Sequence, residues 1–153
     1  MLDRKLFGVF QHTVEDPNFI LFRGFDDRFW VPHSRNTTVD RADIEAVEGL
    51  KILSASLEAG VYAVKSPESK QVFLMGHAEY DPDTLNKEYR RDVAAGIDIL
   101  PPENYFPDND PAQPPMVRWR SCAHLLYANW LNYCVYQTTP YDIQEIREGT
   151  RTV

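Results

Sequence analysis

A chain of 153 residues has the length of one compact domain. Hydrophobic residues make up 43% of it and aromatic residues 12%, which supports a hydrophobic core and argues against general disorder. The net charge of −7 disfavours nucleic acid and anionic membrane as partners, because both select broad basic surfaces. No apolar run reaches the roughly 18 residues of a membrane-spanning helix, and no signal-type segment follows the first residues. We therefore expect a cytoplasmic protein without a membrane partner.

The first third of the chain predicts extended structure. Residues 6–14 mix apolar and polar residues before a turn, and residues 19–22 form a second apolar run in this strand-like region. In residues 28–35 the proline predicts an edge strand or an extended loop, since proline cannot donate to a sheet ladder.

The middle of the chain predicts a short helix and then three strands. Residues 38–44 have the pattern of a short helix whose first free amides are capped by a threonine or aspartate side chain. Residues 50–56, 61–65 and 71–75 are strand-like, with connections too short for crossover helices. They predict an antiparallel meander or hairpin pair whose last strand is buried and ends at Gly76.

Two helices and a proline-rich segment are predicted in the last part. A helix capped by Asp83 or Thr84 runs to Gly96, and its apolar side chains include Val93. A second helix carries one apolar face and ends at Pro140. The residues of that face are Cys122, Leu125, Leu126, Asn129, Trp130, Tyr133 and Cys134. Between the helices, six of the eleven prolines lie in residues 101–115, where Tyr105 and Phe106 predict a packed loop rather than a linker.

His77 and Glu79 follow the end of the predicted strand 71–75. In extended backbone, residues two apart point to the same side, so the imidazole and the carboxylate can face one cleft. A carboxylate that holds one ring nitrogen leaves the other nitrogen free to move a proton. The residues are equally compatible with an ordinary surface loop.

Two further groups carry chemistry in their side chains. His33, Ser34 and Arg35 place a base, a hydroxyl and a guanidinium in one stretch, which fits either a ligand-contacting loop or a solvated strand end. Arg90 and Arg91 on the first long helix can bind a carboxylate or form part of a solvated helix face.

Several ordered strings resemble the C-terminal half of homoserine O-acyltransferases, the homoserine O-succinyltransferases and O-acetyltransferases of methionine biosynthesis. The strings are RGFDD at 23–27, PHSR at 32–35, GHAEYD at 76–81, RDV at 91–93, NYFP at 104–107 and NWLNY at 129–133. The resemblance runs from about residue 5 to residue 143 and covers only the second half of the family's usual length.

The resemblance implies a flavodoxin-like α/β fold of the class I glutamine-amidotransferase type. Only the C-terminal half of that fold is expected here, as a single partial domain over residues 1–153 with several strands and two main helices. The implied reaction moves an acyl group from succinyl-CoA or acetyl-CoA to a cysteine and then to the hydroxyl of L-homoserine. Acyl-CoA is the co-substrate, no other cofactor is expected, and the residues present do not distinguish the two donors.

The resemblance also implies roles for single residues. His77 matches the general base of the family, and Glu79 matches the acid that orients it. Lys5, Ser34 and Arg91 match residues that contact the substrate, with the arginine on the substrate carboxylate. Proton transfer by such a base fits a reaction in which a thiol and a hydroxyl must each lose a proton.

The nucleophilic cysteine of the family belongs to its N-terminal half, and no strand-to-helix turn with a cysteine occurs here. We expect the chain to need a Cys-bearing N-terminal half or to work as a homo-oligomer; the alternative is a non-catalytic ligand-binding or interaction remnant. Cys122 is a candidate substitute, because Arg120 and a helix start can lower the pKa of a thiol, although a plain buried cysteine also fits.

A metal site is the third hypothesis for this chain. His33, His77 and Glu79 are residue types that bind metal ions. The two cysteines have no metal-type spacing, so our prediction is that the site contains no metal.

Overall fold

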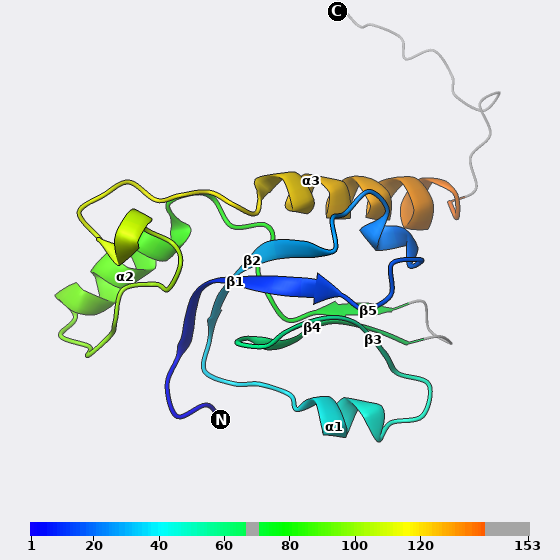
Figure 1. The fold of residues 1–153 in the computed structure, drawn as a ribbon, viewed down its shortest axis with the longest axis horizontal. Helices are drawn as coiled ribbons and strands as arrows, with labels where there is room; N and C mark the ends of the chain where they lie inside the picture. Colours follow the sequence, from blue (N-terminus) through cyan, green and yellow to red (C-terminus); the bar gives the residue numbers. More distant parts are fainter. Residues whose placement is uncertain (67–70, 140–153) are drawn as a thin grey trace, which may run out of the picture.

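The computed structural model describes residues 1–66 and 71–139. Within them a five-stranded antiparallel sheet has the strand order β2-β1-β3-β4-β5 (Figure 1). In chain order the elements are β1 (Leu6–Val14), the 3-10 helix η1 (Ile20–Phe22), β2 (Arg28–Arg35), α1 (Arg41–Glu45), β3 (Lys51–Ser56), β4 (Gly60–Lys65), β5 (Val72–Leu74), α2 (Thr84–Ala94), the 3-10 helix η2 (Pro107–Asn109), α3 (Arg120–Asn129) and the π-helical segment η3 (Trp130–Tyr136). None of the helices in the described ranges is both long and apolar enough to cross a bilayer.

The sheet consists of two parts that meet at one end. β1 and β2 form a long ladder, whereas β1 meets β3 only through Thr13 and Val14. β3, β4 and β5 form the predicted antiparallel meander. Pro32 lies in β2, and β2 is an edge strand as the sequence predicts, because only an edge tolerates a residue without an amide proton.

The sheet curls until its two edges approach each other. β5 and β2 are at opposite ends of the strand order, yet the amide of His77, just after β5, donates a hydrogen bond of 2.8 Å to the carbonyl of Pro32. The curl encloses a core that includes Val31, Leu53 and Tyr62.

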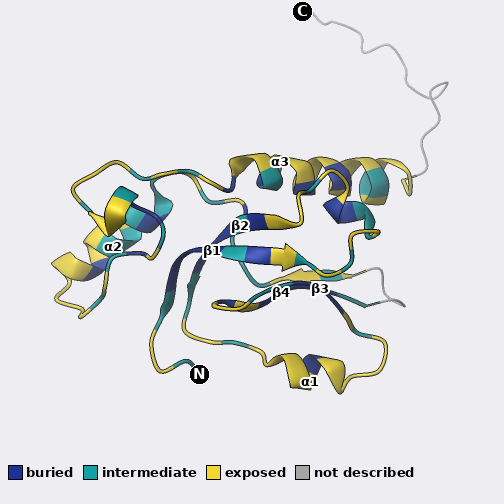
Figure 2. Ribbon diagram, viewed as in Figure 1, coloured by how far each residue is buried: buried dark blue, intermediate teal, exposed yellow. Residues whose placement is uncertain are grey.

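The helices cover different parts of the sheet. α3 contributes Ala123 and Leu126 to the enclosed core, whereas α1 contacts β3 in a separate cluster (Figure 1). α2 lies beyond one end of the strands (Figure 1), with both exposed and half-buried residues along it (Figure 2). Its Leu85 packs with Tyr105 and Phe106 of the proline-rich segment, and all three residues are buried.

The structure corrects three details of the predicted elements. Residues 19–22 are not a strand: they include the 3-10 helix η1, where Phe22 turns inward to contact the rings of Phe25 and Phe29. The strand before Gly76 is not buried, because β5 is the second edge of the sheet, and Phe73 is 44% exposed. Asp40 and Asp83 occupy helix N-cap positions without forming a side-chain capping hydrogen bond.

The apolar faces of the long helices are narrower than the sequence predicts. Leu126 and Asn129 of α3 are buried, but Leu125 and Trp130 are exposed, and so is Val93 of α2. Pro140, which was predicted to end the second helix, lies outside the described residues.

Two histidines lie in contact inside the curl. His12 donates through Nδ1–H to the carbonyl of Phe10 at 3.0 Å, so its Nε2 accepts a hydrogen bond of 3.2 Å from Nε2–H of His33. Both side chains are fully buried, and within residues 1–66 and 71–139 Nδ1 of His33 makes no hydrogen bond. Burial lowers the pKa of His12 to about 4 and, helped by repulsion from the charged form of His12, that of His33 to about 2.

This pair should make the fold acid-labile. Below the ordinary histidine pKa of 6.5 the unfolded chain binds protons that the folded chain excludes. The contribution to stability is therefore complete above pH 6.5 and is lost as the pH falls toward about 4 for His12 and toward about 2 for His33. His33→Gln keeps a donor for His12, so we expect the pH slope of the unfolding free energy between pH 6 and 5 to fall by about 1.2 kcal/mol per pH unit.

Urea unfolding at several pH values measures this slope. His124→Gln, on the exposed face of α3, controls for the loss of a histidine as such. Equal slopes in the wild type and in His33→Gln would contradict the pKa assignments.

Candidate active site

A close backbone approach positions the segment that carries His77. The amide of Met75 donates to the carbonyl of Tyr62 at 2.8 Å, and two residues later the His77 amide reaches Pro32. A Cβ added at Gly76 would lie 2.7 Å from Cγ1 of Val31 and 2.9 Å from the ring of His33. Glycine is therefore required for the chain to cross from β4 to β2.

His77 and Glu79 form a hydrogen-bonded pair on the outer side of this crossing. Nδ1–H of His77 donates to Oε1 of Glu79 at 2.7 Å, and the two side chains are 38% and 54% exposed. This bond sets the tautomer and leaves the lone pair on Nε2. The arrangement can accept a proton at Nε2, and the carboxylate can stabilise the imidazolium that forms.

Tyr80 completes this group. Its ring stacks on the imidazole of His77, with ring centroids 4.4 Å apart and an interplanar angle of 11°. The indole Nε1–H of Trp119 donates to the Tyr80 carbonyl at 3.0 Å. Burial, together with the carboxylates of Glu88 and Glu79, raises the pKa of the Tyr80 phenol, so this ring lies in the field of both acids.

The three residues predicted to contact the substrate converge on one carboxylate. Nζ of Lys5 and the hydroxyl of Ser34 each donate to Oε1 of Glu88 at 2.7 Å, and a guanidinium nitrogen of Arg91 lies 3.7 Å from the same oxygen. The residue before β1, together with β2 and α2, thus brings together side chains that are far apart in the sequence.

Asp92 is the second acid of this cluster. Nε of Arg91 donates to Oδ1 of Asp92 at 2.7 Å, and Lys5 lies 3.4 Å from Oδ2. Arg91 and Lys5 hold the pKa of this buried carboxyl below its usual range. The Arg91 side chain is 68% exposed, so its guanidinium can still bind an incoming carboxylate. Arg90 donates instead to Asn86 and to the carbonyl of Pro111.

The structure separates the residues of the PHSR string. His33 points into the core, Ser34 points to Glu88, and Arg35 donates to the carbonyls of Thr37 and Ala59. They do not form one ligand-contacting loop, because successive side chains of a strand face opposite sides of the sheet.

The other two sequence hypotheses lose support. The buried Nε2 of His33 binds His12, and in the described part of the chain no group of three or more His, Cys, Asp or Glu residues could hold a metal ion. Cys122 packs partly buried against the core, and burial raises the pKa of its thiol rather than lowering it. The structure therefore favours the hypothesis that Cys122 is a structural cysteine and not the nucleophile.

Sequence reasoning missed Glu88, Asp92 and Tyr80. Glu88 and Asp92 are four residues apart on α2, so their shared face was recognisable, but nothing in the spacing indicated that Lys5 and Ser34 would reach it.

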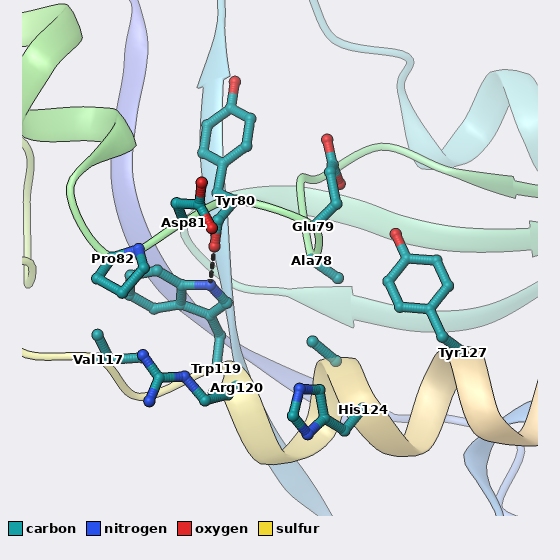
Figure 3. Close-up of a pocket in the computed structure, with 11 residues that line it drawn as sticks. Ala78, Glu79, Tyr80, Asp81, Pro82, Val117, Trp119, Arg120, His124 and Tyr127 are labelled. Atoms are coloured by element: carbon teal, nitrogen blue, oxygen red, sulfur yellow. Dashed lines mark hydrogen bonds between the residues drawn. The ribbon is translucent and has the colours of Figure 1, made fainter.

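A cavity of about 360 Å³ borders Glu79 (Figure 3). The loop from Ala78 to Pro82 forms one wall and the start of α3 forms the other, with His124 and Tyr127 on the helix side. Burial and the charge of Glu79 raise the pKa of the Tyr127 phenol. The cavity offers room for part of a substrate beside the carboxylate of the pair.

Comparison with known proteins gives closely similar relatives. The homoserine O-acetyltransferase of Acetivibrio thermocellus is 56% identical over 146 residues, which is 95% of this chain and 48% of the relative. That of Petrotoga mobilis is 55% identical over 97% of this chain and 48% of its own length, and that of Geobacillus kaustophilus is 58% identical over 92% and 47%. The chain thus spans about half the length of these relatives.

A solved structure shares the fold. The crystal structure of SMU.1228c matches with a TM-score of 0.57 and 16% identity, over 84% of this chain and 52% of that one. This likeness concerns the fold alone and agrees with an α/β arrangement built on a curled antiparallel sheet. The family model described as homoserine O-succinyltransferase matches residues 1–141, and the chain therefore belongs to that family.

Proposed function

We propose that this chain takes part in acyl transfer from an acyl-CoA to the hydroxyl of L-homoserine. It supplies the general base His77, the orienting acid Glu79 and the substrate anchors, while the nucleophilic cysteine comes from an N-terminal half. The observation that carries the proposal is the 2.7 Å bond between His77 and Glu79, in a chain that belongs to the homoserine O-succinyltransferase family.

The pair would act twice in the reaction. Nε2 of His77 first accepts the proton of the cysteine thiol, whose sulfur attacks the acyl-CoA thioester, and the proton then passes to the departing CoA thiolate. In the second step Nε2 accepts the proton of the homoserine hydroxyl as that oxygen attacks the acyl-enzyme, and the proton then passes to the departing cysteine thiolate, which regenerates the thiol. Glu79 stabilises the imidazolium in both steps.

The cluster around Glu88 has the charges to recognise an amino acid. The exposed guanidinium of Arg91 can bind the α-carboxylate, and the carboxylates of Glu88 and Asp92 suit the α-ammonium group. Lys5 and Ser34, which both donate to Glu88, line the same cluster.

The wider setting of the reaction is part of the proposal. The family description names succinyl transfer and the relatives' names say acetyl transfer, so either acyl-CoA is a candidate donor, with no further cofactor. The whole protein would be cytoplasmic and have a flavodoxin-like fold of the glutamine-amidotransferase type, to which this chain would contribute its antiparallel sheet. Exposed apolar side chains of α3 and η3, among them Leu125, Trp130 and Leu131, offer a surface for the N-terminal half or for a second copy.

The catalytic pair is tested by joining this chain to the N-terminal half of the Acetivibrio thermocellus relative and measuring release of free CoA. With L-homoserine and acetyl-CoA or succinyl-CoA, His77→Asn should lower kcat by at least about a hundredfold, because the variant has no general base. Cys122→Ser is the matched control and should keep the activity.

Three outcomes of this assay are informative. Activity that survives His77→Asn would contradict the role of the base. Activity lost in Cys122→Ser would mean that the nucleophile lies in this chain. Absence of turnover in every combination would favour the non-catalytic remnant.

The substrate cluster predicts a separate effect on binding. Glu88→Gln removes the charge that holds Lys5 and Ser34, so the KM for L-homoserine should rise at least about tenfold while kcat changes less, as expected for the loss of a charge-assisted hydrogen bond. The steady-state kinetics of the joined protein measure both constants. Glu103→Gln, which removes an exposed partner of Arg4, is the control, and equal KM values in the two variants would count against the cluster.

A further inference from the structure

We propose that Tyr80 is a positioning residue that holds the imidazole of His77 in the orientation needed for proton transfer; this inference rests on the proposed function. The bond to Glu79 fixes Nδ1 alone, and the partly exposed ring can still swing about that anchor. The Tyr80 ring covers one imidazole face at a centroid distance of 4.4 Å and an angle of 11°, which restricts this motion.

Tyr80 can perform this role because the core holds its backbone. Its amide donates to the His77 carbonyl at 3.3 Å, which closes a turn between the two stacked residues. Its carbonyl accepts the indole proton of Trp119 at 3.0 Å, and Trp119 is buried in the cluster formed with Leu85 and Tyr105. The orientation of the catalytic ring is therefore tied to the packed core rather than to the loop alone.

Tyr80 also connects the two parts of the site. Its phenol lies in the field of Glu79 in the catalytic pair and of Glu88 in the substrate cluster. A single ring thus contacts His77 and is subject to the charge of both acids. The stacking on His77 explains why a tyrosine that takes part in no proton transfer should affect the rate.

The experiment measures, in this chain alone, how firmly the His77 ring is held in one orientation. With histidine labelled with nitrogen-15, NMR gives the exchange rate of the Nδ1 proton with water. Tyr80→Phe keeps the stacked ring and should match the wild type. Tyr80→Leu removes the stack and should raise the exchange rate about tenfold, equivalent to about 1.4 kcal/mol.

Two further variants separate positioning from folding. Tyr89→Leu removes an aromatic ring from the same cluster without touching His77, and it should leave the exchange rate unchanged. Trp119→Phe keeps the aromatic bulk but removes the donor to the Tyr80 carbonyl, so it should give an intermediate rate and serves if Tyr80→Leu does not fold. Wild-type exchange in Tyr80→Leu or in Trp119→Phe, or equal acceleration in Tyr89→Leu, would overturn the inference.

Kinetics of the joined protein separate this inference from the proposed function. Tyr80→Leu should lower kcat about tenfold with the KM for L-homoserine within about twofold, since the ring is held differently and the cluster is intact. An ordered His77 ring in a protein without any turnover would refute the proposed function and leave the positioning role in place. A KM change with unchanged kcat and unchanged exchange would refute the positioning role.

Discussion

The hydrogen bond from the His77 amide to the Pro32 carbonyl is the contact on which the rest of the structure depends. It joins the segment after one edge strand to the opposite edge strand and so closes the curl of the sheet. The bond forms because Pro32 lies in an edge strand with a carbonyl to offer, and because Gly76 has no side chain to collide with Val31 and His33.

Closure of the curl places the side chains around Gly76 in two environments, one buried and one partly exposed. Inside the curl, His33 stacks on His12, and both rings are neutral because burial penalises their charged forms. Outside the curl, the hydrogen-bonded side chains of His77 and Glu79 are partly exposed, so a substrate can reach them. Successive side chains of β2 face opposite sides of the sheet, so Ser34 points away from the core that holds His33 and donates to Glu88.

Local pattern was enough to predict much of this fold. The meander of β3 to β5, the edge position of Pro32 and the helix that ends before Gly96 follow from periodicity, proline chemistry and glycine placement. The contact between His77 and Glu79 was predicted from extended backbone, but residues 77–80 form a turn, and this turn brings the two side chains together. The meeting of Lys5, Ser34 and Arg91 at Glu88 could not be predicted from pattern, since it depends on three elements packing together. The curl of the sheet and the exposure of β5 could not be predicted either, because strand order depends on long-range pairing.

Hydrogen exchange at the His77 amide tests this view of the site most directly. If closure positions His77, its amide should exchange slowly in the wild type, at a rate typical of the sheet, and much faster in Gly76→Ala, where a Cβ would push the chain away from Val31. A His77 amide that exchanges as fast as an open loop in the wild type, or that is equally protected in Gly76→Ala, would show that His77 is positioned in some other way.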